Sequence, residues 1–169
     1  MKPRFPSKKL NPWPLAILAG LTCTGYAYYL YVNTNIPDSL VLTVYLAGAS
    51  LFFLLMKWWK RSTRSVIIRI LLSLACGGGV LMAILLWTNK TFASKESLVA
   101  DFPVVARGTT PGGSGIHTPY LVIDFNGNRK QLSFYPEAAA LADKAQVVKV
   151  NYRQGLLGFE IIRSRALYK

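Results

Sequence analysis

Long runs of apolar residues dominate the first half of the chain, at residues 13–32, 40–56 and 66–87. An apolar helix of about 20 residues is long enough to cross the roughly 30 Å hydrocarbon core of a bilayer. Each run therefore predicts a membrane-spanning helix. The first run is longer than a signal-peptide core and is not followed by a small-residue cleavage site, so we expect it to be retained.

After residue 98 the apolar residues alternate with polar ones, which is typical of strands that bury one face. Five segments are predicted as strands: residues 98–107, 120–125, 130–135, 147–153 and 157–163. Pro103 interrupts the first of them, which suggests an edge strand or a bulge. The dipeptide Asn126-Gly127 predicts a tight hairpin between the second and third segments. Residues 136–145 begin with Pro136 and predict one short helix, because proline suits the first helical position.

The predicted fold class is a membrane α protein with a small β domain, in which five strands form a partly open, OB-like or SH3-like barrel. The predicted domain organisation follows from the long apolar runs and from the alternating apolar and polar residues. It consists of a basic cytoplasmic tail (1–12), a three-helix transmembrane region (13–87), a linker (88–97) and an extracytoplasmic β-rich domain (98–169).

Positive charge is concentrated on one side of the predicted spans. The net charge is +13, from 20 lysines and arginines against seven acidic residues. The tail and the link after the second span are basic, whereas residues 33–39 contain no lysine or arginine. Cytoplasmic loops carry such an excess, so we expect the tail inside the cell, the β domain outside, and residence in the inner (plasma) membrane.

Basic residues beside membrane spans also contact anionic lipid. This accounts for the charge better than nucleic acid does, so membrane lipid is an expected partner and nucleic acid is not. Arg69 lies about one turn inside the third run, where a long side chain reaches the headgroups. The residues expected at lipid headgroups are Lys57, Lys60, Arg61, Arg64 and Arg69.

Small residues recur within the spans and let helix backbones approach closely. The candidate helix-packing residues are Ala16, Gly20, Gly48, Gly77, Gly78 and Gly79. They are expected to pack the three helices of one chain together. The alternative is that they contact another subunit, in which case the protein would form a homo-oligomer.

No catalytic signature is present in the sequence. His117 is the single histidine, and the two cysteines, Cys23 and Cys76, lie inside predicted spans. We therefore expect no catalytic residue, no metal site and no cofactor. Residues 89–91 match an N-glycosylation acceptor pattern. The glycine-rich segment 108–115 predicts a flexible loop, and its candidate partner-contact residues are Gly108, Pro111, Gly112, Gly113, Gly115 and His117.

These features favour a non-enzymatic membrane protein whose outer β domain binds other proteins. Residues 148–152 resemble the end of extracytoplasmic β domains on several small bacterial membrane proteins. An accessory or structural subunit of a bacterial envelope complex is therefore the expected role. The alternatives are a component of an oligomeric transporter or channel, and a membrane immunity protein.

Overall fold

The computed structural model describes residues 13–58, 65–111 and 117–168. The chain divides into two compact units. One unit comprises Met1–Tyr28 and Leu42–Ala83, and the other comprises Tyr29–Val41 and Ile84–Lys169. The segment that links the first two helices therefore belongs to the same unit as the β domain.

The described helices include three that are long and apolar enough to cross a membrane, at Pro14–Val32, Asp38–Trp58 and Val66–Thr91. The first two correspond to α1 (Trp13–Val32) and α2 (Asp38–Trp58). The third is built from α3 (Val66–Leu72), the π-helical turn η1 (Ser73–Gly77) and α4 (Gly78–Thr91). It continues past Trp87, so the first residues of the expected linker form the last turn of α4.

Close backbone contacts hold the helices of the first unit together. A Cβ atom on Gly48 would lie 2.6 Å from the carbonyl oxygen of Gly77, and one on Gly78 would lie 2.7 Å from the ring of Tyr45. Gly20 faces Cys76 and Gly79 faces Thr24, again with no room for a side chain. Of the residues expected to pack helices, Ala16 alone is exposed.

The π-helical turn η1 is supported by side chains from the neighbouring helices. A π turn interrupts the regular hydrogen-bond ladder of an α-helix. Thr24 Oγ1 donates to the carbonyl oxygen of Ala75 at 2.9 Å, and the Tyr45 hydroxyl donates to that of Leu74. Carbonyl groups in an apolar setting need such partners, so these bonds stabilise the irregular turn.

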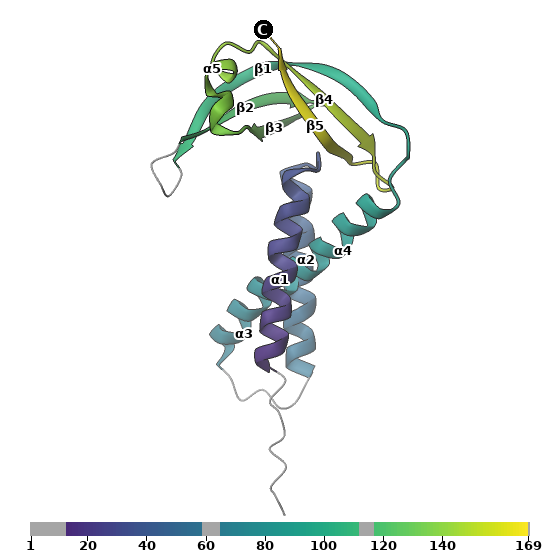
Figure 1. The fold of residues 1–169 in the computed structure, drawn as a ribbon. Coiled ribbons are helices and arrows are strands. Elements are labelled where there is room, and N and C mark those ends of the chain that lie inside the picture. The colour runs from purple at the N-terminus through teal and green to yellow at the C-terminus, as the bar shows by residue number, and fades with distance from the viewer. Residues whose placement is uncertain (1–12, 59–64, 112–116, 169) are drawn as a thin grey trace, which may run out of the picture. The chain divides into compact units, whose positions relative to one another are not determined.

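Five antiparallel strands form one open sheet in the order β3-β2-β1-β4-β5 (Figure 1). Their bounds are β1 Leu98–Pro111, β2 His117–Phe125, β3 Asn128–Ser133, β4 Val147–Gln154 and β5 Glu160–Tyr168. A short helical segment between β3 and β4 consists of η2 (Pro136–Ala138) and α5 (Ala139–Ala142). The predicted combination of apolar helices with a five-stranded β domain is thus confirmed.

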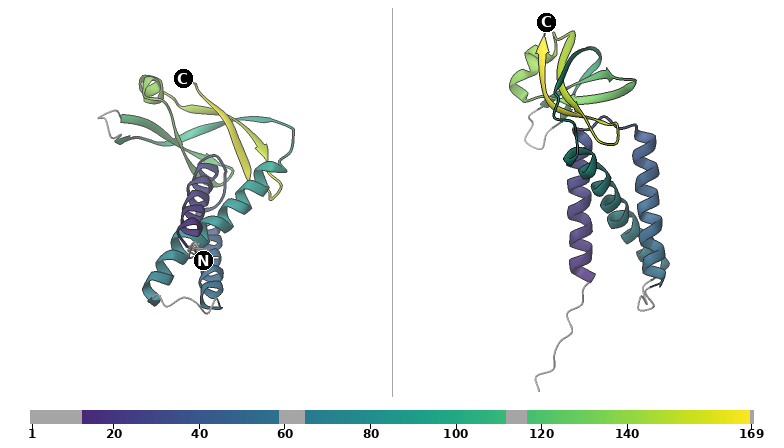
Figure 2. Two further views of the ribbon diagram at one scale, coloured as in Figure 1. Left: turned by 60° about the horizontal axis from the view of Figure 1, so that its bottom comes forward. Right: turned by 90° about the vertical axis from the view of Figure 1, so that its right-hand side faces the viewer.

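The central strand β1 changes partner along its length. Its first half pairs with β4 as far as Pro103, and its second half pairs with β2 from Val104 onward. A bulge between Val104 and Ala106 marks the change. Bulges bend a strand and increase its twist, and the sheet is visibly curved in Figure 2.

The core lies on one face of this sheet. Alternate residues of β2, β3 and β4 are fully buried there: Leu121, Ile123, Phe125, Leu132, Val148 and Val150. The ring of Phe125 packs edge-on against Phe102 and Tyr152, with centroids 4.7 and 5.2 Å apart. Asn126 and Gly127 have φ angles of 52° and 86°, so the predicted tight hairpin turn is present.

Candidate functional site

The segment between α1 and α2 pairs with the edge strand β5, and both belong to the second unit. The Asn35 amide donates to the Glu160 carbonyl oxygen, and the Ile162 amide donates to the Asn33 carbonyl oxygen, both at 2.8 Å. Thr34 forms an antiparallel bridge with Ile161. These bonds make the segment a short extra strand at the beginning of β5.

A polar cluster ties this segment to the turn between β2 and β3. Asn35 Nδ2 donates to the Phe125 carbonyl oxygen at 2.9 Å and to Glu160 Oε2 at 3.0 Å. Asn126 Nδ2 donates to the other carboxylate oxygen of Glu160 at 2.8 Å. Because β3 and β5 are the two edges of the sheet, the cluster bridges its open side.

A buried lysine reinforces the same bridge. Lys130 Nζ on β3 donates to the carbonyl oxygens of Tyr31 and Thr34, each at 2.8 Å. The ammonium also lies 4.5 Å from the centroid of the Tyr31 ring. Burial lowers the pKa of Lys130 to about 8, and the nearby Asp38 carboxylate opposes that shift. Lys130 is only 8% exposed, and its two hydrogen bonds connect β3 to the segment that pairs with β5.

The sequence contains a signal for the burial of Lys130, although the prediction of β3 did not include it. Lys130 lies two and four residues before Leu132 and Phe134, which were predicted to face inward. Alternate residues of a strand share one face, so the Lys130 side chain points to the core side of β3. Lysine is rarely buried without partners. The partners here come from a segment about a hundred residues earlier, which no local pattern indicates.

The turn between β4 and β5 rests on the last turn of α4. Asn89 Nδ2 donates to the Phe159 carbonyl oxygen at 3.0 Å, and its Oδ1 accepts from the Leu157 amide at 2.9 Å. Gly155 lies against the Asn89 side chain with no room for a Cβ. Asn89 is fully buried, so the acceptor pattern at residues 89–91 has no accessible amide for a glycan.

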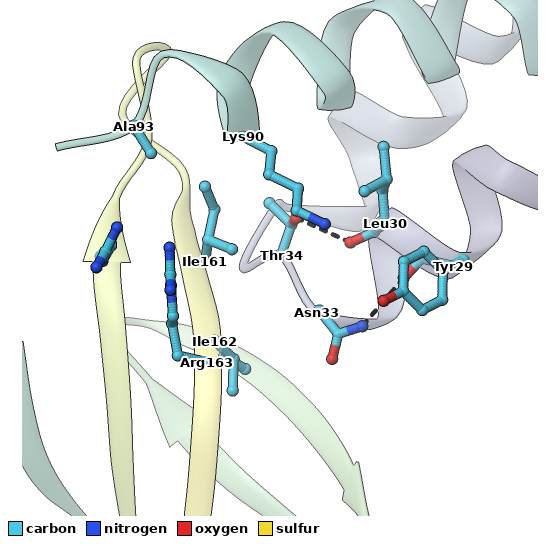
Figure 3. A pocket seen from close by; sticks show the side chains of 10 residues that line it. Tyr29, Leu30, Asn33, Thr34, Lys90, Ala93, Ile161, Ile162 and Arg163 are labelled. Atoms are coloured by element: carbon cyan, nitrogen blue, oxygen red, sulfur yellow. Dashed lines mark hydrogen bonds between the residues drawn. The ribbon is translucent and has the colours of Figure 1, made fainter. Parts of the chain in front are cut away.

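Beside these contacts the second unit contains a pocket of about 350 Å³ (Figure 3). Its walls are the end of α1, the paired segment at Asn33 and Thr34, the end of α4 with Lys90, and strands β4 and β5. Among the described residues that line it, three are cationic, Lys90, Arg153 and Arg163, and none is acidic. In Figure 3 the Lys90 side chain extends from α4 toward Thr34 and Leu30.

The first residues of the expected glycine-rich loop belong to a strand instead. Gly108 and Pro111 lie in β1, and His117 is the first residue of β2 and pairs with Pro111. Gly108 packs against the ring of Tyr120, its partner on β2. Gly112, Gly113 and Gly115 lie outside the described residues. Among the described residues, the predicted partner-contact region is therefore the paired ends of β1 and β2.

The residues expected at lipid headgroups are only partly described. Lys57 is exposed in the last turn of α2. Arg69 lies within α3 and is half-buried, and its Nε has no hydrogen-bond partner among the described residues. Lys60, Arg61 and Arg64 lie outside the described residues.

With this geometry in place, the chain was compared with known proteins. No protein-family model, curated protein or solved structure matched it.

Proposed function

We propose that the chain is a non-enzymatic integral membrane protein and an accessory or structural subunit of a bacterial envelope complex. Three helices cross the inner membrane, the basic tail is cytoplasmic, and the β domain is extracytoplasmic and binds other proteins. The β domain is a partly open barrel of the OB-like or SH3-like kind. The order of its strands, with one short helix between β3 and β4, supports this class.

Membrane insertion is supported by the outer surfaces of the helices. Large apolar side chains are widely exposed on them, as at Leu15 (66%), Leu54 (60%) and Ile67 (70%). Exposing apolar surface to water costs about 25 cal/mol per Å². A lipid environment removes this cost, and the helices are long enough to cross it.

The observation that best supports protein binding is the exposed edge of β5. The paired segment bonds only to the beginning of this strand, at residues 160–162. Within the described part of the chain, no backbone group bonds to the outer edge of β5 beyond Ile162. An open edge offers unpaired N–H and C=O groups to an added strand from a partner.

The connection of the β domain to the first interhelical segment supports a structural role. Lys130, Asn35 and Glu160 join both sheet edges to residues 31–35. A partner bound to the sheet would therefore be connected through these hydrogen bonds to the segment between α1 and α2. A β domain attached only by a flexible linker would not have this connection. Such an arrangement suits a subunit that holds a partner in a fixed position.

Site-specific photo-crosslinking in native membranes tests the proposal. A photoreactive amino acid replaces Ser164 or Ala166, which are exposed on β5, and the matched control replaces exposed Lys144 after α5. We expect crosslinked partners from the two β5 positions and few or none from the control. Recovery of uncrosslinked monomer alone from both β5 positions would refute partner binding at this edge.

A further inference from the structure

The pocket of the second unit has the composition of an anion site. Its three cationic side chains come from different elements: Lys90 from α4, Arg153 from β4 and Arg163 from β5. Like charges repel, and no carboxylate among the described lining residues balances them. An anion bound between them would relieve this repulsion.

The strand geometry brings the two arginines to the same pocket. Arg153 pairs with Ile161 across β4 and β5. Asn151 pairs with Ser164 and Tyr152 with Ile162, so Arg163 is the extra residue of a bulge in β5. A bulge redirects side chains, and this one leaves Arg163 lining the pocket together with Arg153 and Ile161.

The donors are available for a ligand. Arg153 Nε is buried and has no hydrogen-bond partner among the described residues. Burying an unpaired donor of a charged group is unfavourable, so such atoms usually have a partner in the functional state. Lys90 already lies 5.5 Å from the centroid of the Tyr29 ring, which leaves the two arginines as the principal donors.

We propose that this pocket binds the phosphate group of an anionic ligand through Arg153 and Arg163, with Lys90 adding a third positive charge. The planar guanidinium group matches the oxygens of a phosphate in pairs. A volume of about 350 Å³ lies at the lower end of the range of small-molecule pockets, and suits a headgroup. Leu30, Ile161 and Ile162 supply an apolar wall for the attached carbon atoms.

An anionic phospholipid is the favoured source of this phosphate, a step that rests on the membrane insertion proposed above. Tyr29 and Lys90 lie near the ends of α1 and α4, at the polar ends of two helices long enough to cross a membrane. Long lysine and arginine side chains near the ends of membrane-spanning helices reach the interface, where the lipid headgroups lie. A soluble phosphate ester shares the same chemistry, and the experiment separates the two sources.

The test measures thermal unfolding of the full chain in a neutral detergent, with three added probes. These are short-chain phosphatidylglycerol, phosphatidylcholine of the same chain length, and glycerol 3-phosphate. We expect a saturable rise in the unfolding midpoint with phosphatidylglycerol and none with phosphatidylcholine. Glycerol 3-phosphate should require about tenfold more ligand if a lipid is the source, whereas an equal effect would assign the pocket to soluble phosphate esters.

The variant Arg163→Gln changes an exposed residue and should leave the fold intact. Because it removes one charged hydrogen-bond donor, we expect about tenfold weaker phosphatidylglycerol binding, and a larger loss when Arg153→Gln is added. The matched control is Arg129→Gln with Lys144→Gln, both exposed and outside the pocket, which should bind like the wild type.

Unchanged binding by Arg163→Gln and the double variant, or no greater effect of phosphatidylglycerol and glycerol 3-phosphate than of phosphatidylcholine, would overturn the proposal. The measurement uses purified protein without any partner. Its failure therefore leaves the crosslinking test of the β5 edge unaffected, and the reverse also holds.

Discussion

Lys130 Nζ on β3 donates a 2.8 Å hydrogen bond to the carbonyl oxygen of Thr34, although 96 residues separate the two. This bond joins one edge strand of the sheet to the segment that pairs with the other edge. The β domain and the link between α1 and α2 are for this reason one folded unit.

The stability of the protein should rise as pH increases through the titration of Lys130. Its pKa is about 8 in the folded protein and 10.5 ordinarily, so between these values the unfolded chain binds more protons than the folded one. A shift of this size corresponds to roughly 3 kcal/mol across that range. The free energy of unfolding, measured from pH 7 to pH 10.5, checks this.

Lys130→Met should remove most of that rise, because the variant has no amine to titrate. The comparison cancels the contributions of other groups, while Asp38 and Tyr31 still face the site. Lys144→Met alters an exposed lysine and should keep the wild-type pH dependence. Parallel pH curves for wild type and Lys130→Met would show that burial does not depress this pKa.

Gly155→Ala should destabilise the protein by about 1–3 kcal/mol, because the new Cβ would overlap the Asn89 side chain. Asn89→Ala should cost a similar amount, since it leaves the Phe159 carbonyl and the Leu157 amide without their partner. In the double variant the overlap is absent, so the two costs should not add. Additive costs in a denaturant double-mutant cycle would contradict this contact.

Gly48→Val should lower the free energy of unfolding of the helical unit. Its Cβ would meet the Gly77 carbonyl oxygen at 2.6 Å, and the expected loss is at least about 1–3 kcal/mol. Gly25→Val is the matched control, because nothing lies within 4 Å of a Cβ at that position. Thermal unfolding in detergent, followed by size-exclusion chromatography, should separate the two variants. Equal unfolding midpoints would exclude the packing described for Gly48.

The proposed orientation predicts which positions react with a membrane-impermeant thiol reagent on intact cells. In a chain with Cys23 and Cys76 replaced by alanine, Thr109→Cys on exposed β1 should be labelled without lysis. Ser7→Cys in the basic tail should be labelled only after lysis. The opposite pattern would place the β domain in the cytoplasm and move the expected partners to that compartment.

The prediction of a glycine-rich loop over residues 108–115 shows where local patterns fail. Gly and Pro disfavour strands on average, yet Gly108 and Pro111 lie in β1. Pairing with Tyr120 and His117 on β2 outweighs the local preference.

The last strand was predicted at residues 157–163, and a contact distant in sequence again changes its bounds. Leu157 instead lies in the turn bonded to Asn89, and β5 runs from Glu160 to Tyr168.

Sequence alone determined the three long apolar helices, the alternating strands and the tight turn at Asn126-Gly127. Apolar run length, side-chain period and turn chemistry are local properties, so they can be read directly along the chain. Three-dimensional contacts alone reveal that residues 33–35 meet both edges of the sheet, that Lys130 is buried, and that Lys90, Arg153 and Arg163 share a pocket. These relations depend on which distant backbone groups satisfy one another, and no short stretch of sequence contains that information.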